Sequence, residues 1–193
     1  MPSKAKNKDT VVQKITKMAN SKSDTTRLKA SELLYARMEA QDFETIKTVP
    51  TASLIKLATD PSTEVRMQTV FNWMVLELLP KEVIIKLLSD KDSIIKNTVL
   101  DSHSAKKKLS DDELSKAANA FICEYKKNGF VENTGFRQFL NPDLDRLPKG
   151  TLEAMHAIRH RSDFLATLKI LRRMNGGTPE LDKRIEELAR KPN

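Results

Sequence analysis

Four residues in the C-terminal third of the chain have the types and the spacing of a metal site. Glu153, His156, His160 and Asp163 are separated by three, four and three positions, so a continuous helix would place them on one face. Imidazole and carboxylate groups together bind several divalent ions. However, Arg159 stands where a zinc protease has glutamate, and no second Glu-x-x-His completes a di-iron pattern. We therefore expect a solvated polar face here, with no metal and no cofactor.

Five basic residues in the same region are candidates for binding an anion. They fall within fifteen positions on two adjacent predicted helices, and they are Arg159, Arg161, Lys169, Arg172 and Arg173. Arginine binds phosphate in a planar, bidentate way. The nearest aromatic residue, Phe164, belongs to an apolar helical stripe, so we expect phosphate contacts without base stacking. The alternative is an exposed basic surface without a dedicated ligand. A second basic run occupies residues 106–108.

The remaining reactive side chains are expected to be structural. His103 follows Ile95 and Val99 at four-residue steps, which predicts a histidine at the end of a buried helical stripe. The alternative is a pH switch with Asp101 as its partner. Cys123 lies in an apolar segment, where a lone cysteine behaves as a small hydrophobe. The chain has neither a glycine-rich phosphate loop nor a Gly-x-Ser-x-Gly elbow, so we do not expect an enzyme.

Composition limits the class of protein. Of the 193 residues 39% are hydrophobic, which is enough to build a core. No apolar run approaches the ~18 residues of a membrane span. The basic N-terminus lacks the apolar stretch of a secretion signal, so we expect a cytoplasmic protein. The net charge is +8, and it is unevenly distributed. Residues 1–30 contain eight basic and two acidic side chains, whereas residues 31–103 contain eight basic and eleven acidic side chains. Basic segments favour an anionic partner, whether nucleic acid or acidic protein.

The elements that must position these residues are predicted to be helices. All five glycines lie at or after Gly129, whereas hairpin-rich β proteins need glycine in their turns. Apolar residues recur at steps of three and four, which is the helical period. The predicted helices cover residues 10–20, 24–40, 51–59, 61–78, 81–89, 92–103, 111–127, 151–160, 162–175 and 179–191.

Local signals support several of these helices. Asp60 followed by Pro61 predicts a capping carboxylate before the first helical position. Ser110 and Glu113 have the spacing of a capping box, and Pro179 is predicted to begin the last helix. The residues predicted to be buried between helices are Leu57, Val70, Phe71, Met74, Leu87 and Val99.

An internal repeat organises the first half of the chain. Residues 53–60 align without a gap with residues 83–90, and residues 15–19 match residues 54–58 at an offset of 39. Each unit comprises an apolar helix, a polar turn and a second helix. The alignments place a basic residue in the first turn of each second helix, namely Arg27, Arg66 and Lys96. A single helix pair cannot bury its apolar face, so neighbouring pairs are expected to stack; an ordinary helical bundle is the alternative.

Residues 57–66 resemble the turn and second-helix start of a HEAT repeat, with aspartate and proline in the turn and then Val-Arg. The copy at 83–103 has Lys91 in place of the proline, and the copy at 11–38 has Ser21 in place of the aspartate. The resemblance implies an all-α fold, a short HEAT-like α-solenoid followed by additional C-terminal helices.

This interpretation divides the chain into four parts. They are a flexible basic segment (1–9), a HEAT-like region (10–128, with the resemblance over roughly 10–103), an irregular connection (129–150) and C-terminal helices (151–193).

The resemblance implies a non-enzymatic interaction module that holds a protein partner on one helical face. The alternative is nonspecific binding of nucleic acid through the basic ends of the chain. A third hypothesis is a DNA-repair enzyme similar to the HEAT-like alkylpurine glycosylases. The sites of those enzymes use aromatic and acidic residues, whereas the single tryptophan, Trp73, is expected in a buried helix and no catalytic set maps onto this chain.

Overall fold

The computed structural model describes residues 4–114, 116–117, 120 and 179–190. The elements formed by these residues are all helices, and no strand occurs among them. The chain divides into two units, residues 1–108 and residues 109–193, and each is treated by itself. The expected helices at 151–160 and 162–175 and the expected connection at 129–150 lie outside the described residues. No helix in the described part is both long and apolar enough to span a bilayer.

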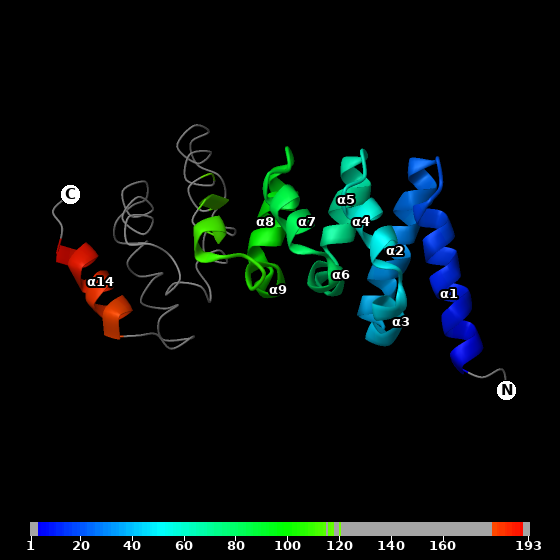
Figure 1. Cartoon of the computed structure of the whole chain (residues 1–193), viewed down its shortest axis with the longest axis horizontal. Coiled ribbons are helices and arrows are strands. Elements are labelled where there is room, and N and C mark those ends of the chain that lie inside the picture. Colours follow the sequence, from blue (N-terminus) through cyan, green and yellow to red (C-terminus); the bar gives the residue numbers. More distant parts are fainter. Residues whose placement is uncertain (1–3, 115, 118–119, 121–178, 191–193) are drawn as a thin grey trace. The chain divides into compact units, whose positions relative to one another are not determined.

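Residues 4–108 form nine helices, which fall into three sets of three (Figure 1). The first set is α1 (Lys4–Ala19), α2 (Asp24–Glu39) and α3 (Phe43–Thr48); the second is α4 (Thr51–Ala58), α5 (Thr63–Val70) and α6 (Trp73–Leu78); the third is α7 (Lys81–Leu88), α8 (Ser93–Asp101) and α9 (His103–Lys106).

Corresponding helices of successive sets contact one another within residues 4–108. The first helices pack in the order α1, α4, α7, the second helices in the order α2, α5, α8, and the third helices in the order α3, α6, α9. Each set therefore covers the apolar faces of the set before it. Burial of these faces is the main source of stability for helices as short as eight residues, which are marginal alone.

The third helix of each set is a feature that the sequence analysis missed. The predicted helix 61–78 is two helices, α5 and α6, and the predicted helix 92–103 ends at Asp101. The break between α5 and α6 occurs because Asn72 caps α6: its side-chain oxygen accepts from the N–H groups of Met74 and Val75, at 3.0 and 3.2 Å. Side chains thirty positions apart cap the three short helices, namely Asp42, Asn72 and Ser102.

Two of the three predicted helix starts are confirmed. The Ser110 N–H donates to Glu113 Oε2 at 2.7 Å, and the Glu113 N–H donates to Ser110 Oγ at 3.3 Å. Helix α14 (Pro179–Arg190), in the second unit, begins at Pro179. The prediction for Asp60 is wrong in its position, because Ser62 is the residue before α5. The Asp60 carboxylate accepts from the Ser62 N–H at 2.9 Å, outside the helix, and also from Arg27.

The predicted core is correct except around the break at Asn72. Leu57, Val70, Met74, Leu87 and Val99 are buried. The aromatic side chains on either side of Asn72 are the exceptions: 41% of Phe71 and 46% of Trp73 is exposed. The reason is that α5 ends at Val70 and α6 begins at Trp73, so the helical spacing of three and four residues does not apply to the residues at the break itself. At the other end, α1 begins at Lys4, so residues 4–9 of the segment expected to be flexible are helical.

Candidate interaction surfaces

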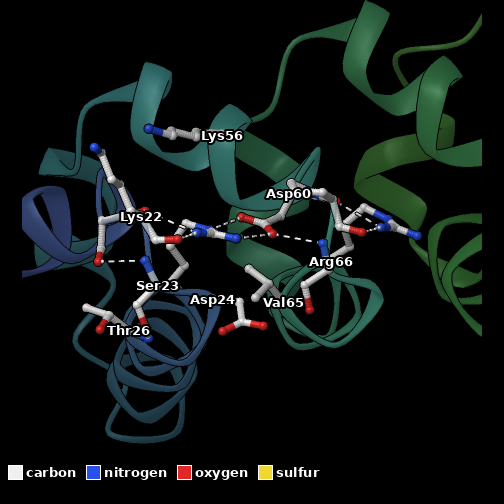
Figure 2. A network of polar contacts seen from close by, with 12 residues as sticks. Lys22, Ser23, Asp24, Thr26, Lys56, Asp60, Val65 and Arg66 are labelled. Atoms are coloured by element: carbon white, nitrogen blue, oxygen red, sulfur yellow. Dashed lines mark hydrogen bonds and ion pairs between the residues drawn. The ribbon is translucent and has the colours of Figure 1, made fainter.

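A buried ion pair joins the first set of helices to the second. Arg27 of α2 donates from Nε and Nη2 to the two carboxylate oxygens of Asp60, at 2.5 and 3.1 Å. Its Nη1 donates to the carbonyls of Ser21 and Lys22 in the turn after α1, at 3.1 and 2.9 Å. Only 10% of the Arg27 side chain and 1% of the Asp60 side chain is exposed. Figure 2 shows these contacts from close by.

A second ion pair repeats this arrangement between the second and third sets. Arg66 of α5 donates from Nε and Nη2 to the carboxylate of Asp90, at 2.8 and 3.0 Å. Its Nη1 donates to the backbone carbonyls of Asp60 and Pro61, at 2.8 and 3.1 Å. We call Arg27, Asp60, Arg66 and Asp90 the arginine–aspartate ladder. Because both contacts are bidentate, the ladder fixes the orientation of each turn as well as its position.

Two members of the ladder, Arg27 and Asp90, have pKa values shifted in favour of their charged forms. The hydrogen bonds to Asp60 raise the pKa of Arg27, and burial opposes this effect. Burial pushes the pKa of Asp90 upward, but the hydrogen bonds from Arg66 and from the Asp92 N–H outweigh it, so this pKa lies below its usual value. A general acid or base needs a pKa near the working pH. The Arg66–Asp90 pair therefore suits a structural role better than proton transfer.

Neutral polar contacts connect the same helices elsewhere. The hydroxyl groups of Ser31 on α2 and Thr69 on α5 are 2.8 Å apart. The Asn72 side chain, besides capping α6, donates from Nδ2 to the Leu34 carbonyl at 3.0 Å. Ser31, Thr69 and Asn72 are all buried, so these bonds fix how α2 lies against α5 and α6.

The basic run at 106–108 does not form a surface cluster. Lys106 is buried. The Lys108 ammonium donates to the carbonyls of Leu76 at 3.1 Å and Glu77 at 2.6 Å, and also to that of Leu79. Lys108 thus stabilises the C-terminal end of α6, where a positive charge is favourable. Burial lowers the pKa of Lys108, and the Glu77 carboxylate opposes this shift. Of the three lysines in this run, only Lys107 is exposed and could contact an external anion.

Aromatic side chains gather on the short third helices. Phe43 begins α3 and Trp73 begins α6, and their ring centroids are 5.4 Å apart with an interplanar angle of 60°. Tilted ring pairs at this separation are favourable. Phe71 is the C-terminal cap of α5 and is exposed. His103 begins α9 thirty positions after Trp73 and is exposed, so its predicted place in a buried stripe is wrong. We use the name third-helix face for four residues that lie at or next to the starts of the third helices, namely Phe43, Phe71, Trp73 and His103.

The other predicted sites cannot be located on this structure. The anion-binding candidates Arg159, Arg161, Lys169, Arg172 and Arg173 lie outside the described residues, and so do Cys123 and the metal candidates Glu153, His156, His160 and Asp163. Within the residues that the structure describes, no group of three or more His, Cys, Asp or Glu side chains could hold a metal ion.

The third-helix face was missed at the level of sequence because Phe71 and Trp73 fit the apolar stripe of one long helix. The thirty-residue offset from Phe43 to Trp73 and on to His103 was the available signal. Comparison of the chain with protein-family models, with curated proteins and with solved structures finds no match.

Proposed function

We propose that residues 10–103 form a short HEAT-like helical repeat, and that the chain is a non-enzymatic module that binds a protein partner through the third-helix face. The repeat is supported by the ordered contacts between corresponding helices and by the two equivalent ion pairs. The single cysteine fits a reducing compartment such as the cytoplasm.

The observation that carries this proposal is the exposure of Phe71 and Trp73 beside each other in the sequence, on either side of Asn72. Large aromatic side chains are enriched in protein interfaces, and tryptophan is the commonest type among residues that dominate binding energy. The contact with Phe43 holds the Trp73 ring in place, so little side-chain entropy remains to be lost on binding. Because 41% of Phe71 and 46% of Trp73 is exposed, burying the rest of either side chain against a partner would contribute roughly 1 kcal/mol.

A pull-down from a nuclease-treated lysate tests the proposal with two matched variants. Phe71→Ser with Trp73→Ser removes the aromatic surface. Ile85→Ser with Ile94→Ser is the control, because these exposed isoleucines lie on α7 and α8. We expect one protein to be retained by the wild type and by the control and lost from the aromatic variant. Retention by all three proteins, or equal loss from both variants, would contradict the proposal.

A further inference from the structure

Exposed lysines recur at equivalent positions along the first helices of the three sets. Lys17, Lys56 and Lys86 each lie two residues before the end of α1, α4 and α7. Lys22 and Lys91 follow five residues after Lys17 and Lys86, in the turns that lead to α2 and α8. All five side chains are exposed. We call these five residues the lysine edge.

The positive charge of the lysine edge is not neutralised by ion pairs within the part of the chain that the structure describes. None of the five lysines belongs to an ion pair among the described residues. Lys56 donates to the side-chain oxygen of Asn20 at 3.1 Å, which is a neutral acceptor. Of the acidic groups in the turns, Asp60 and Asp90 are bonded to arginine, and Asp92 caps α8. Lys91 lies close enough to Asp90 to help lower its pKa, but its own ammonium remains at the surface.

The exposed carboxylate of Asp24 lies away from the neighbouring lysine amines (Figure 2). In the view of Figure 2, the amines of Lys22 and Lys56 lie on one side of the arginine–aspartate ladder, and the carboxylate of Asp24 lies on the other. A hollow of about 200 Å³ opens beside the second and third turns. Lys86 and Lys91 line it together with the ladder residues Asp60, Arg66 and Asp90. Lys86 and Lys91 therefore flank a concave surface with room for a phosphate group.

We infer that the lysine edge binds the phosphate backbone of double-stranded nucleic acid without reading its sequence. This inference concerns a surface other than the third-helix face and does not rest on the protein-partner proposal.

Three properties of the edge favour a duplex over other polyanions. Lysine is a flexible point charge that needs no fixed geometry at its acceptor. A duplex carries about one negative charge per ~1.7 Å of its axis, so every lysine of a periodic row meets a phosphate whatever the register. No residue of the edge is aromatic. The exposed Phe71 follows the C-terminal end of α5, whereas the turn at Asp60 precedes its N-terminal end. A single strand would lack the stacking platforms that usually hold its bases.

The ladder beneath the edge holds the turns that carry the lysines. Arg27 donates to the carbonyl of Lys22 itself, and Arg66 donates to the carbonyls of Asp60 and Pro61. Binding a long, regular polyanion therefore needs no reorganisation of these turns, which reduces the free-energy cost of association.

The test measures binding of a fluorescently labelled duplex DNA to the full chain across a series of salt concentrations. The edge variant is Lys56→Gln, Lys86→Gln and Lys91→Gln. The control variant is Lys29→Gln, Lys107→Gln and Lys116→Gln, which removes three exposed lysines outside the edge: one on α2, one directly after α9 and one in the second unit. Both variants lose the same net charge, so a difference between them reports position. Circular dichroism melts of both establish that they are folded.

We expect the wild type and the control to bind duplex DNA and the edge variant to bind about tenfold more weakly or worse at 0.1 M salt. The salt dependence of the edge variant should be shallower by ~0.9 per lost phosphate contact, or ~2.7 in total. Replacing the same three lysines by arginine should preserve binding, because the charge remains. Single-stranded DNA of the same sequence should bind more weakly than the duplex.

Three results would overturn the inference. The first is that the wild type does not bind duplex DNA at low salt, where electrostatic attraction is least screened. The second is that the edge and control variants are weakened equally, which would make net charge the cause. The third is that polyglutamate displaces the duplex from the wild type and binds the edge at least as tightly, which would make an acidic protein the partner.

Discussion

Removing one partner of the Arg66–Asp90 pair should cost far more stability than removing both. Each side chain is 9% exposed, so the pair is largely but not completely withdrawn from water. Breaking a buried pair costs about 3–5 kcal/mol, because the surviving charge is left without its partner. We expect Asp90→Leu to cost about 3 kcal/mol, at the lower end of this range, because water reaches the edge of the pair.

The second single variant, Arg66→Met, leaves the Asp90 carboxylate unpaired and also removes the donor to the carbonyls of Asp60 and Pro61. We therefore expect about 3–4 kcal/mol for this change. In the double variant no charge is stranded, and replacing a buried pair by apolar residues of similar volume is often neutral or stabilising. Its cost should be about 1 kcal/mol, mostly for the unpaired carbonyls.

The assay is urea unfolding of the wild type, both single variants and the double variant, followed by circular dichroism. The sum of the single-variant costs should exceed the double-variant cost by several kcal/mol, which measures the coupling within the pair. If the costs add within about 0.5 kcal/mol, the two side chains do not interact in solution and the ladder has no energetic role.

Three further changes test other parts of the structure. Phe71→Ala should cost less than about 1 kcal/mol, whereas Leu57→Ala should cost roughly 2–5 kcal/mol, because Phe71 is exposed and Leu57 is buried; equal costs in thermal melts would place Phe71 in the core. Asn72→Ala should cost about 2–3 kcal/mol through the lost cap and the unpaired Leu34 carbonyl, and Asn72→Asp should cost at least as much, because it keeps the cap oxygen but buries a carboxylate against that carbonyl. The pKa of Asp90 is lower in the folded protein than in the unfolded chain, where it is about 4. The ionised carboxylate therefore stabilises the fold above that pH, and this contribution is lost as the pH falls through the folded pKa. The stability difference between wild type and Asp90→Asn should therefore narrow below about pH 4; a difference independent of pH would contradict the direction of the shift.

The sequence predicted the parts of this fold that depend on local pattern. Helical spacing correctly assigned three residues to the core, namely Leu57, Leu87 and Val99. The thirty-residue offset between α4 and α7 can be read directly from the amino-acid sequence. The capping box at Ser110 was predicted for the same reason, since its two bonds join residues three positions apart.

The errors have two physical causes. Helices of four or six residues, such as α9 and α3, are too short to show a periodic apolar stripe, so neither was predicted as a helix of its own. Other assignments depend on residues that are distant in sequence. Asp60 has the pattern of a cap, yet Arg27 binds it from 33 positions earlier. Lys108 looked like part of a basic surface, yet it reaches the carbonyls of α6 about thirty positions earlier.

The lysine edge shows how a segment with more acidic than basic residues can present a basic surface. Residues 31–103 contain eight basic and eleven acidic side chains. In this segment Asp60 and Asp90 accept from arginine, and Asp92 caps a helix. Charge counted along the sequence therefore does not describe the charge that a partner meets. What matters is which carboxylates the fold has already paired.

The two proposed surfaces should act independently. The lysine edge lies at the start of the second helices and the third-helix face at their end, and the eight residues of α5 separate them by about 12 Å at ~1.5 Å per residue. Changes this far apart, without shared contacts, usually have additive effects. The Phe71→Ser and Trp73→Ser variant should therefore lose its protein partner while keeping the duplex affinity of the wild type, and the edge variant should do the reverse. If the aromatic variant loses both ligands, the two surfaces form one site, and the aromatic side chains contact nucleic acid rather than protein.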